Sequence, residues 1–248
     1  DVSWMSETEA YCQDVIGAVT DLPAQGERPH RAGDYAFNNI GLSSFFMLSS
    51  TMPDDLRAEK GYYVVGGCGG NIAWHTEHDL MEIADRDNLV RDIKVYLAAV
   101  MGVANAAVLP FDWRATAKEF SDTLARYDSA AGRRFDLAPA SEALAGLAAS
   151  LDAFYAKIEG GGADTRKANH AIKRLARILV PINFTRGPRF RHDPALPIPP
   201  LPDLALCEGL ADLDDATLGF AQTQLTRGRN KVVAALREAK RIVDAATA

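Results

Sequence analysis

The stretch from Gly69 to Asp79, GGNIAWHTEHD, has the residue types and spacing that could do chemistry. In it, His75 follows a glycine loop and a short apolar step, and an acidic turn comes next. A histidine that is held rigid on one side, with oxygens nearby to orient its ring, is well placed to bind a metal ion. A single loop histidine more often binds no metal, and His78, three residues later, adds little as a second ligand. Whether His75 is a metal ligand therefore has to be judged from the surrounding sequence.

Several catalytic patterns are absent from the sequence. There is no HExxH, which excludes a zinc site carried on one helix, and no GxSxG nucleophile elbow. The loop Gly66–Gly70 lacks the GK[ST] ending of a phosphate-binding loop, which argues against nucleotide binding. The three cysteines, Cys12, Cys68 and Cys207, lie far apart and form no CxxC pair. We therefore expect buried free thiols rather than a disulfide framework or a zinc knuckle.

The charge balance limits the kinds of partner that the chain can bind. With 27 lysines and arginines against 33 aspartates and glutamates, the chain has a formal net charge of −6, so we expect no affinity for nucleic acid. The one basic cluster, Arg166 to Arg177, is expected to be the solvated face of an amphipathic helix. The longest uncharged apolar run, Val95 to Pro110, has 16 residues and is interrupted by Gly102 and Asn105. It is too short to be a membrane segment.

The elements around His75 are short in residues 1–112. Ser6 and Glu9 have the spacing of a capping box, which predicts a helix from Ser6 to near Leu22. The run Ser43–Leu48 predicts a short buried strand. Apolar residues at 89, 93, 97, 100 and 104 predict a helix that ends before Pro110.

Residues 113–248 are predicted to be mostly helical. Four apolar stripes at helical spacing each need a partner, so a helical bundle is the economical arrangement. The stripes are Phe120, Leu124 and Tyr127; Leu144, Leu147, Leu151 and Ile158; Ala168, Ile172, Leu175 and Leu179; and Leu225, Val232, Leu236 and Val243. A connection with seven prolines, from Pro181 to Pro202, is predicted to be extended, stiff and partly exposed. The chain opens at Asp1 in patterned sequence, as expected of a piece of a longer protein.

Five short motifs occur together in an informative order. They are Gly33-Asp34-Tyr35, IGLSSFF from Ile40, Trp74-His75-Thr76-Glu77, ANAAVLPFD from Ala104, and Arg189-Phe190-Arg191-His192. In this order they resemble the closing third of the catalytic domain of the M28 zinc peptidases, the glutamate carboxypeptidase II and transferrin receptor-like family, followed by its helical dimerisation domain. The resemblance covers essentially the whole chain.

The resemblance implies a fold of class α/β plus all-α. Residues 1–112 would be the C-terminal part of the α/β catalytic domain, and residues 113–248 the helical dimerisation domain, which implies a homodimer. His75 would be the last ligand of a site that binds two zinc ions in the intact enzyme. The other ligands and the catalytic glutamate would precede Asp1, so the chain would contain no catalytic residue and would be inactive alone.

The resemblance also implies a peptide substrate. Arg31, Gly33, Asp34 and Trp74 would border the substrate pocket, although Asp34 could equally cap the following helix. Trp74 stands where glutamate carboxypeptidase II has a tyrosine, and the lysine–tyrosine pair that recognises a terminal glutamate in that enzyme has no counterpart here. The intact enzyme could therefore also be an aminopeptidase-like member of the family. One alternative to a zinc exopeptidase segment is a non-catalytic dimerisation or interaction module of transferrin receptor-like type. Another is an unrelated α-helical protein in which His75 binds no metal.

Overall fold

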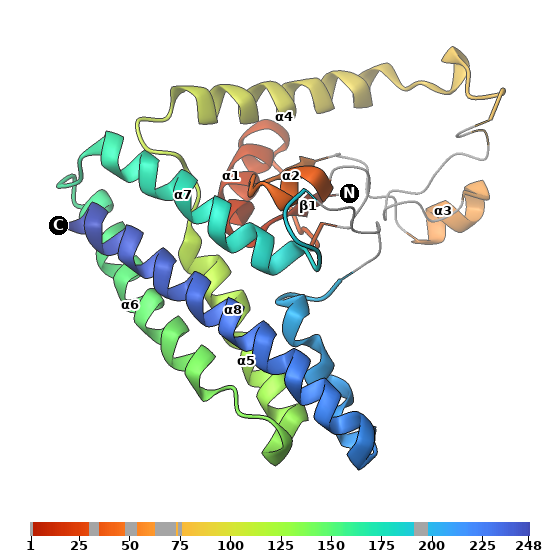
Figure 1. Ribbon diagram of the computed structural model, residues 1–248. Helices are drawn as coiled ribbons and strands as arrows, with labels where there is room; N and C mark the ends of the chain where they lie inside the picture. Colours follow the sequence, from red (N-terminus) through yellow and green to blue (C-terminus); the bar gives the residue numbers. More distant parts are fainter. Residues whose placement is uncertain (1, 30–34, 48–53, 63–72, 74–75, 191–197) are drawn as a thin grey trace. The chain divides into compact units, whose positions relative to one another are not determined.

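The computed structural model describes residues 2–29, 35–47, 54–62, 73, 76–190 and 198–248 (Figure 1). The chain divides into two compact units. The first unit comprises residues 1–29 and 44–106, and the second unit comprises residues 30–43 and 107–248.

The expectation of an α/β domain is wrong. Helices, with the 3₁₀ segments included, make up 73% of the described residues. The strands of the described residues are β1 (Val2–Trp4) and β2 (Phe45–Met47), which pair antiparallel with Val2 opposite Met47. A ribbon of two three-residue strands cannot form the sheet layer that an α/β domain packs between helices. The strand predicted at Ser43–Leu48 is present as β2, but the α/β class came from short motifs, which do not supply further strands.

The first unit is built from short elements and one long helix. Besides the two strands it contains η1 (Ser6–Thr8), α1 (Glu9–Thr20), α3 (Asp54–Lys60), η2 (Met81–Ile83) and α4 (Arg86–Asn105). Helix α1 begins one turn later than the capping box predicts, because Ser6 lies in the 3₁₀ turn and the N-cap is Thr8, without a side-chain cap bond. Asp85 caps α4 through the backbone N–H of Asn88, 2.8 Å away.

A small core joins α1 to α4. Cys12 and Ile16 of α1 pack with Val95 and Ala99 of α4 and with the strand residue Trp4. The Tyr11 hydroxyl donates a hydrogen bond to the carbonyl of Ala99 at 2.5 Å. A Cβ at Gly102 would collide with that hydroxyl, so the close approach of the two helices requires glycine there.

The second unit contains the four predicted helices. They are α5 (Trp113–Ala131), α6 (Ala138–Glu159), α7 (Thr165–Phe184) and α8 (Asp215–Thr247). Helix α8 packs along α6 and α7, and α5 packs on α6. The shorter elements are α2 (Tyr35–Asn39), which packs on α7, and the 3₁₀ segments η3 (Gly132–Arg134) and η4 (Pro202–Asp212).

The predicted apolar stripes form the core of the second unit. Phe120, Leu147, Leu175 and Leu236 are each fully buried, one from each of the four helices. Aspartates cap the N-termini of α5, α7 and α8. Asp164 of α7, for example, accepts the backbone N–H groups of Arg166 and Lys167. Those N–H groups favour the ionised carboxylate and lower the pKa of Asp164.

The proline-rich connection begins later than predicted. Pro181 lies inside α7, which continues to Phe184, so the extended conformation predicted from Pro181 onward is wrong for the first four residues. The carbonyl of Pro181 accepts both the backbone N–H and the hydroxyl of Thr185, which closes the helix. Proline lacks a backbone donor but keeps its carbonyl, and the Pro181 carbonyl is one of the acceptors at the helix end that need a partner.

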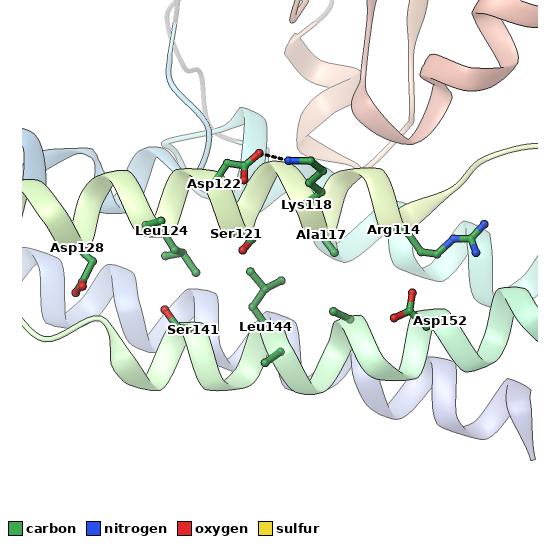
Figure 2. Close-up of a pocket in the computed structure, with 13 residues that line it drawn as sticks. Arg114, Ala117, Lys118, Ser121, Asp122, Leu124, Asp128, Ser141, Leu144 and Asp152 are labelled. Atoms are coloured by element: carbon green, nitrogen blue, oxygen red, sulfur yellow. Dashed lines mark hydrogen bonds and ion pairs between the residues drawn. The ribbon is translucent and has the colours of Figure 1, made fainter.

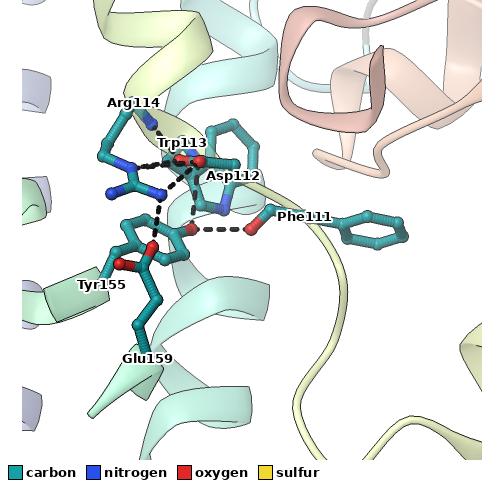
Figure 3. A network of polar contacts seen from close by, with 6 residues as sticks. All are labelled: Phe111, Asp112, Trp113, Arg114, Tyr155 and Glu159. Atoms are coloured by element: carbon teal, nitrogen blue, oxygen red, sulfur yellow. Dashed lines mark hydrogen bonds and ion pairs between the residues drawn. The ribbon is translucent and has the colours of Figure 1, made fainter. Parts of the chain in front are cut away.

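Tyr155 of α6 fixes the point where the chain enters the helical bundle (Figure 3). Its hydroxyl donates to the carbonyl of Phe111 at 2.7 Å and accepts the backbone N–H of Trp113 at 3.0 Å. The Arg114 guanidinium lies 4.7 Å from the centre of the Tyr155 ring and bridges Asp112 and Glu159, at 2.7 and 2.8 Å. The Asp112 carboxylate is the main reason that the pKa of Arg114 is raised.

The change Tyr155→Phe tests this junction. It leaves the buried N–H of Trp113 and the carbonyl of Phe111 without the hydroxyl that pairs with them. We expect the change to lower the free energy of unfolding by about 2 kcal/mol. Urea denaturation followed by circular dichroism measures the loss. The matched control is Tyr127→Phe, which removes one hydrogen bond, to the carbonyl of Pro200, and should cost about 1 kcal/mol. No loss in Tyr155→Phe, or a larger loss in the control, would contradict this role.

Candidate functional site

The predicted site residues lie outside the described residues. This holds for the candidate ligand His75 and for the four residues expected to border a substrate pocket, Arg31, Gly33, Asp34 and Trp74. The glycine loop 66–70 lies outside them as well. These assignments therefore stay predictions. The structure describes residues next to His75 in the sequence, namely Ala73 and the turn from Thr76 onward.

The turn that follows His75 is described from Thr76 onward. The Thr76 hydroxyl donates to the carbonyl of Ala73 at 2.6 Å and accepts the backbone N–H of His78 at 3.2 Å. The side chain of Thr76 thus ties the residue two before His75 to the acidic turn after it. Such a hydroxyl-closed turn is the local chemistry expected of Thr at this place in a loop.

His78 does not converge with other potential ligands. Its side chain is 78% exposed, and its Nε2 lies 3.7 Å from a carboxylate oxygen of Glu77. Within the described ranges, no group of three or more histidines, cysteines, aspartates or glutamates is placed to hold a metal ion. Protein zinc sites use three or four protein ligands. The described part of the chain therefore does not by itself fit a zinc site.

The two described thiols are buried. Cys12 and Cys207 are free and inaccessible, as the sequence predicts, whereas Cys68 lies outside the described residues. Burial raises the pKa of Cys12 to about 12 and that of Cys207 to about 11. Since the thiolate is the nucleophile and the metal ligand, neither group is prepared for catalysis.

A groove of about 560 Å³ runs between α5 and α6 (Figure 2). Its walls are largely small side chains, such as Ala117 and Ala148, and its charged residues include Lys118 and Asp122, which pair with each other at 2.6 Å. Among the described residues that line it there is no histidine or cysteine. The two serines, Ser121 and Ser141, have no histidine base beside them, so the groove holds no activated nucleophile.

The apolar stripe predicted for the helix before Pro110 is exposed. Leu89, Ile93, Leu97 and Val100 of α4 lie at helical spacing and are 57, 55, 59 and 63% exposed. The residues that α4 buries against α1 are on another face, at Val95 and Ala99. Helix α4 is therefore apolar on two faces, one packed and one open. Exposed apolar patches in folded proteins are often surfaces for binding another protein.

No protein-family model and no curated protein matches the chain. Within the described part, none of the helices combines the length and apolar character that crossing a bilayer requires.

The thiol environments give a direct prediction. At pH 8, the raised pKa values leave about one in 10,000 Cys12 groups and about one in 1,000 Cys207 groups as thiolate, against roughly a quarter for an ordinary cysteine. We expect iodoacetamide to alkylate both residues only after the protein is unfolded in urea, as read by peptide mass spectrometry. Rapid labelling of either residue in the folded chain would show that its burial is not maintained.

Proposed function

We propose that this chain is the C-terminal segment of a dinuclear zinc exopeptidase, to which it contributes the last metal ligand, His75. The proposal starts from the motif Trp74-His75-Thr76-Glu77 and its position between the other motifs. Zinc ions in such a site polarise the scissile carbonyl and activate water. The role of this chain would be to hold the His75 imidazole in place through the turn that Thr76 closes.

The open face of α4 is the observation that carries the proposal. Fully burying a leucine, isoleucine or valine side chain stabilises a protein by about 1.5–3 kcal/mol. Four such residues of α4 are more than half exposed, so most of that stabilisation is not realised in this chain. A further part of a longer protein that covers this face would realise it. The same part could supply the metal ligands that the described residues do not provide.

The second candidate is a non-catalytic interaction module. The observation that favours it is the second unit, in which the four long helices bury nearly all of their apolar stripes against one another. Such a unit can serve association alone. The homodimer implied by the resemblance stays a prediction for this unit. Zinc content separates the two candidates, because a non-catalytic module requires no metal.

His75→Ala in the full-length gene product tests the exopeptidase proposal. The change removes one metal ligand, so we expect the zinc content to fall below two ions per chain. We also expect kcat/KM to fall by about three orders of magnitude or more. Activity is measured on aminoacyl p-nitroanilides and on N-acyl dipeptides, with zinc measured by mass spectrometry.

His78→Ala is the matched control, three residues further on. Because the His78 side chain is exposed beside Glu77, its loss should leave zinc content and kcat/KM within about twofold of the unchanged protein. Equal losses at the two positions, or no loss at His75, would overturn the assignment. A full-length product that binds no zinc and cleaves no substrate would favour the interaction module instead.

A further inference from the structure

The exposed face of α7 carries charges of one sign. The helix contains Arg166, Lys167, His170, Lys173, Arg174 and Arg177, and no aspartate or glutamate. Solvated helix faces elsewhere in the second unit mix signs: Lys118 pairs with Asp122 in α5, and Lys240 pairs with Asp244 in α8. Like charges four residues apart destabilise a helix. The composition of α7 therefore does not serve the stability of the isolated helix.

These cations border a groove between α7 and α8. The groove has a volume of about 510 Å³. Its α7 side presents four basic side chains, those of Arg166, Lys167, His170 and Arg174, and its apolar wall comes from α8. That wall is made of Ile242, Ala245 and Ala246. No carboxylate is among the described residues that line it. A cationic rim over an apolar wall is the combination that binds an amphipathic anion.

The cations are only partly compensated by neighbouring groups. Glu238 of α8 lies 3.7 Å from the guanidinium of Arg174 at one end of the groove. Asp164 accepts the backbone N–H groups of Arg166 and Lys167. Those amides are therefore occupied by the helix's own cap, and the attraction for an anion comes from the side chains.

The spacing of the nitrogen-bearing side chains indicates what the groove accepts. Arg166, His170 and Arg174 follow one another at one helical turn, about 6 Å apart along some 12 Å of α7. A single small anion would engage one or two of them. Carboxylates repeated at one-turn spacing on a peptide helix would meet all three, with apolar side chains between them facing Ile242 and Ala245. Single-stranded nucleic acid is disfavoured because none of the described residues that line the groove is aromatic and could stack on a base.

We propose that the α7–α8 groove binds an acidic amphipathic helical segment of a partner protein. The carboxylates of the segment pair with the α7 cations, and its apolar side chains fill the groove against α8. Because the charges lie at a solvent-exposed rim, they set the association rate and the salt dependence, while the apolar wall contributes burial. This site does not depend on the proposed peptidase role, and its test measures neither zinc nor cleavage.

The test uses the full chain and a fluorescent peptide probe of about 14 residues, with glutamates one helical turn apart and leucines between them. Fluorescence anisotropy should show saturable one-to-one binding that weakens as salt is raised. A second peptide with glutamine in place of every glutamate should not bind. Arg166→Glu should weaken binding at least about fivefold. The matched control Arg133→Glu makes the same charge change at an exposed residue outside the groove and should leave binding unchanged.

Ala245→Trp separates binding in the groove from general attraction between opposite charges. It fills the apolar wall without changing charge, and it should weaken binding about as much as Arg166→Glu does. Circular dichroism checks that each variant stays folded. The proposal fails if the acidic peptide does not saturate the chain, if Arg133→Glu weakens binding as much as Arg166→Glu, or if Ala245→Trp has no effect. It also fails if anionic vesicles or single-stranded DNA bind this face more tightly than the peptide does.

Discussion

The helical unit depends on how the chain is held just before α5. Phe111 and Trp113 are tied to one hydroxyl, that of Tyr155 in α6. Just before Phe111, the amide side chain of Asn169 in α7 accepts the N–H of Leu109 at 2.7 Å and donates to the carbonyl of Ala107 at 2.8 Å. Two side chains from two helices thus satisfy the backbone of one short segment. Because buried backbone groups must find partners, this segment sets where α5, α6 and α7 meet.

The two units differ in how completely they bury their apolar residues. In the second unit, the stripe of each long helix is inside. In the first unit, α4 packs Val95 and Ala99 while its longer apolar stripe stays open. An amphipathic helix gains most of its stability from the face it buries rather than from its intrinsic propensity. Among the described residues, the second unit therefore packs its long helices more completely than the first unit packs α4.

The helices of the second unit could be predicted from the sequence because each buries a stripe of regular 3.6-residue period. The α/β class could not be predicted correctly, since short motifs specify residues at particular positions and not the strands between them. The open face of α4 was also missed: periodicity identifies an apolar stripe, but only tertiary packing decides whether it is covered. The same limit applies to the hydroxyl of Tyr155, whose partners lie more than 40 residues away in sequence. The basic cluster of α7 was visible, but its apolar wall comes from α8, about 70 residues later.

Hydrogen exchange tests this difference in packing between the two units most directly. Backbone amides in an incompletely packed helix open locally with a small free energy, whereas amides in a complete core exchange only through larger openings. In the 248-residue chain, we expect amides of α4 (Arg86–Asn105) to exchange at least about 100-fold faster than those of α6 (Ala138–Glu159). If the exopeptidase proposal holds, the protection of α4 should rise toward that of α6 in the longer protein. Protection of α4 equal to that of α6 in the 248-residue chain would contradict the account, because the first unit would then be complete without a cover.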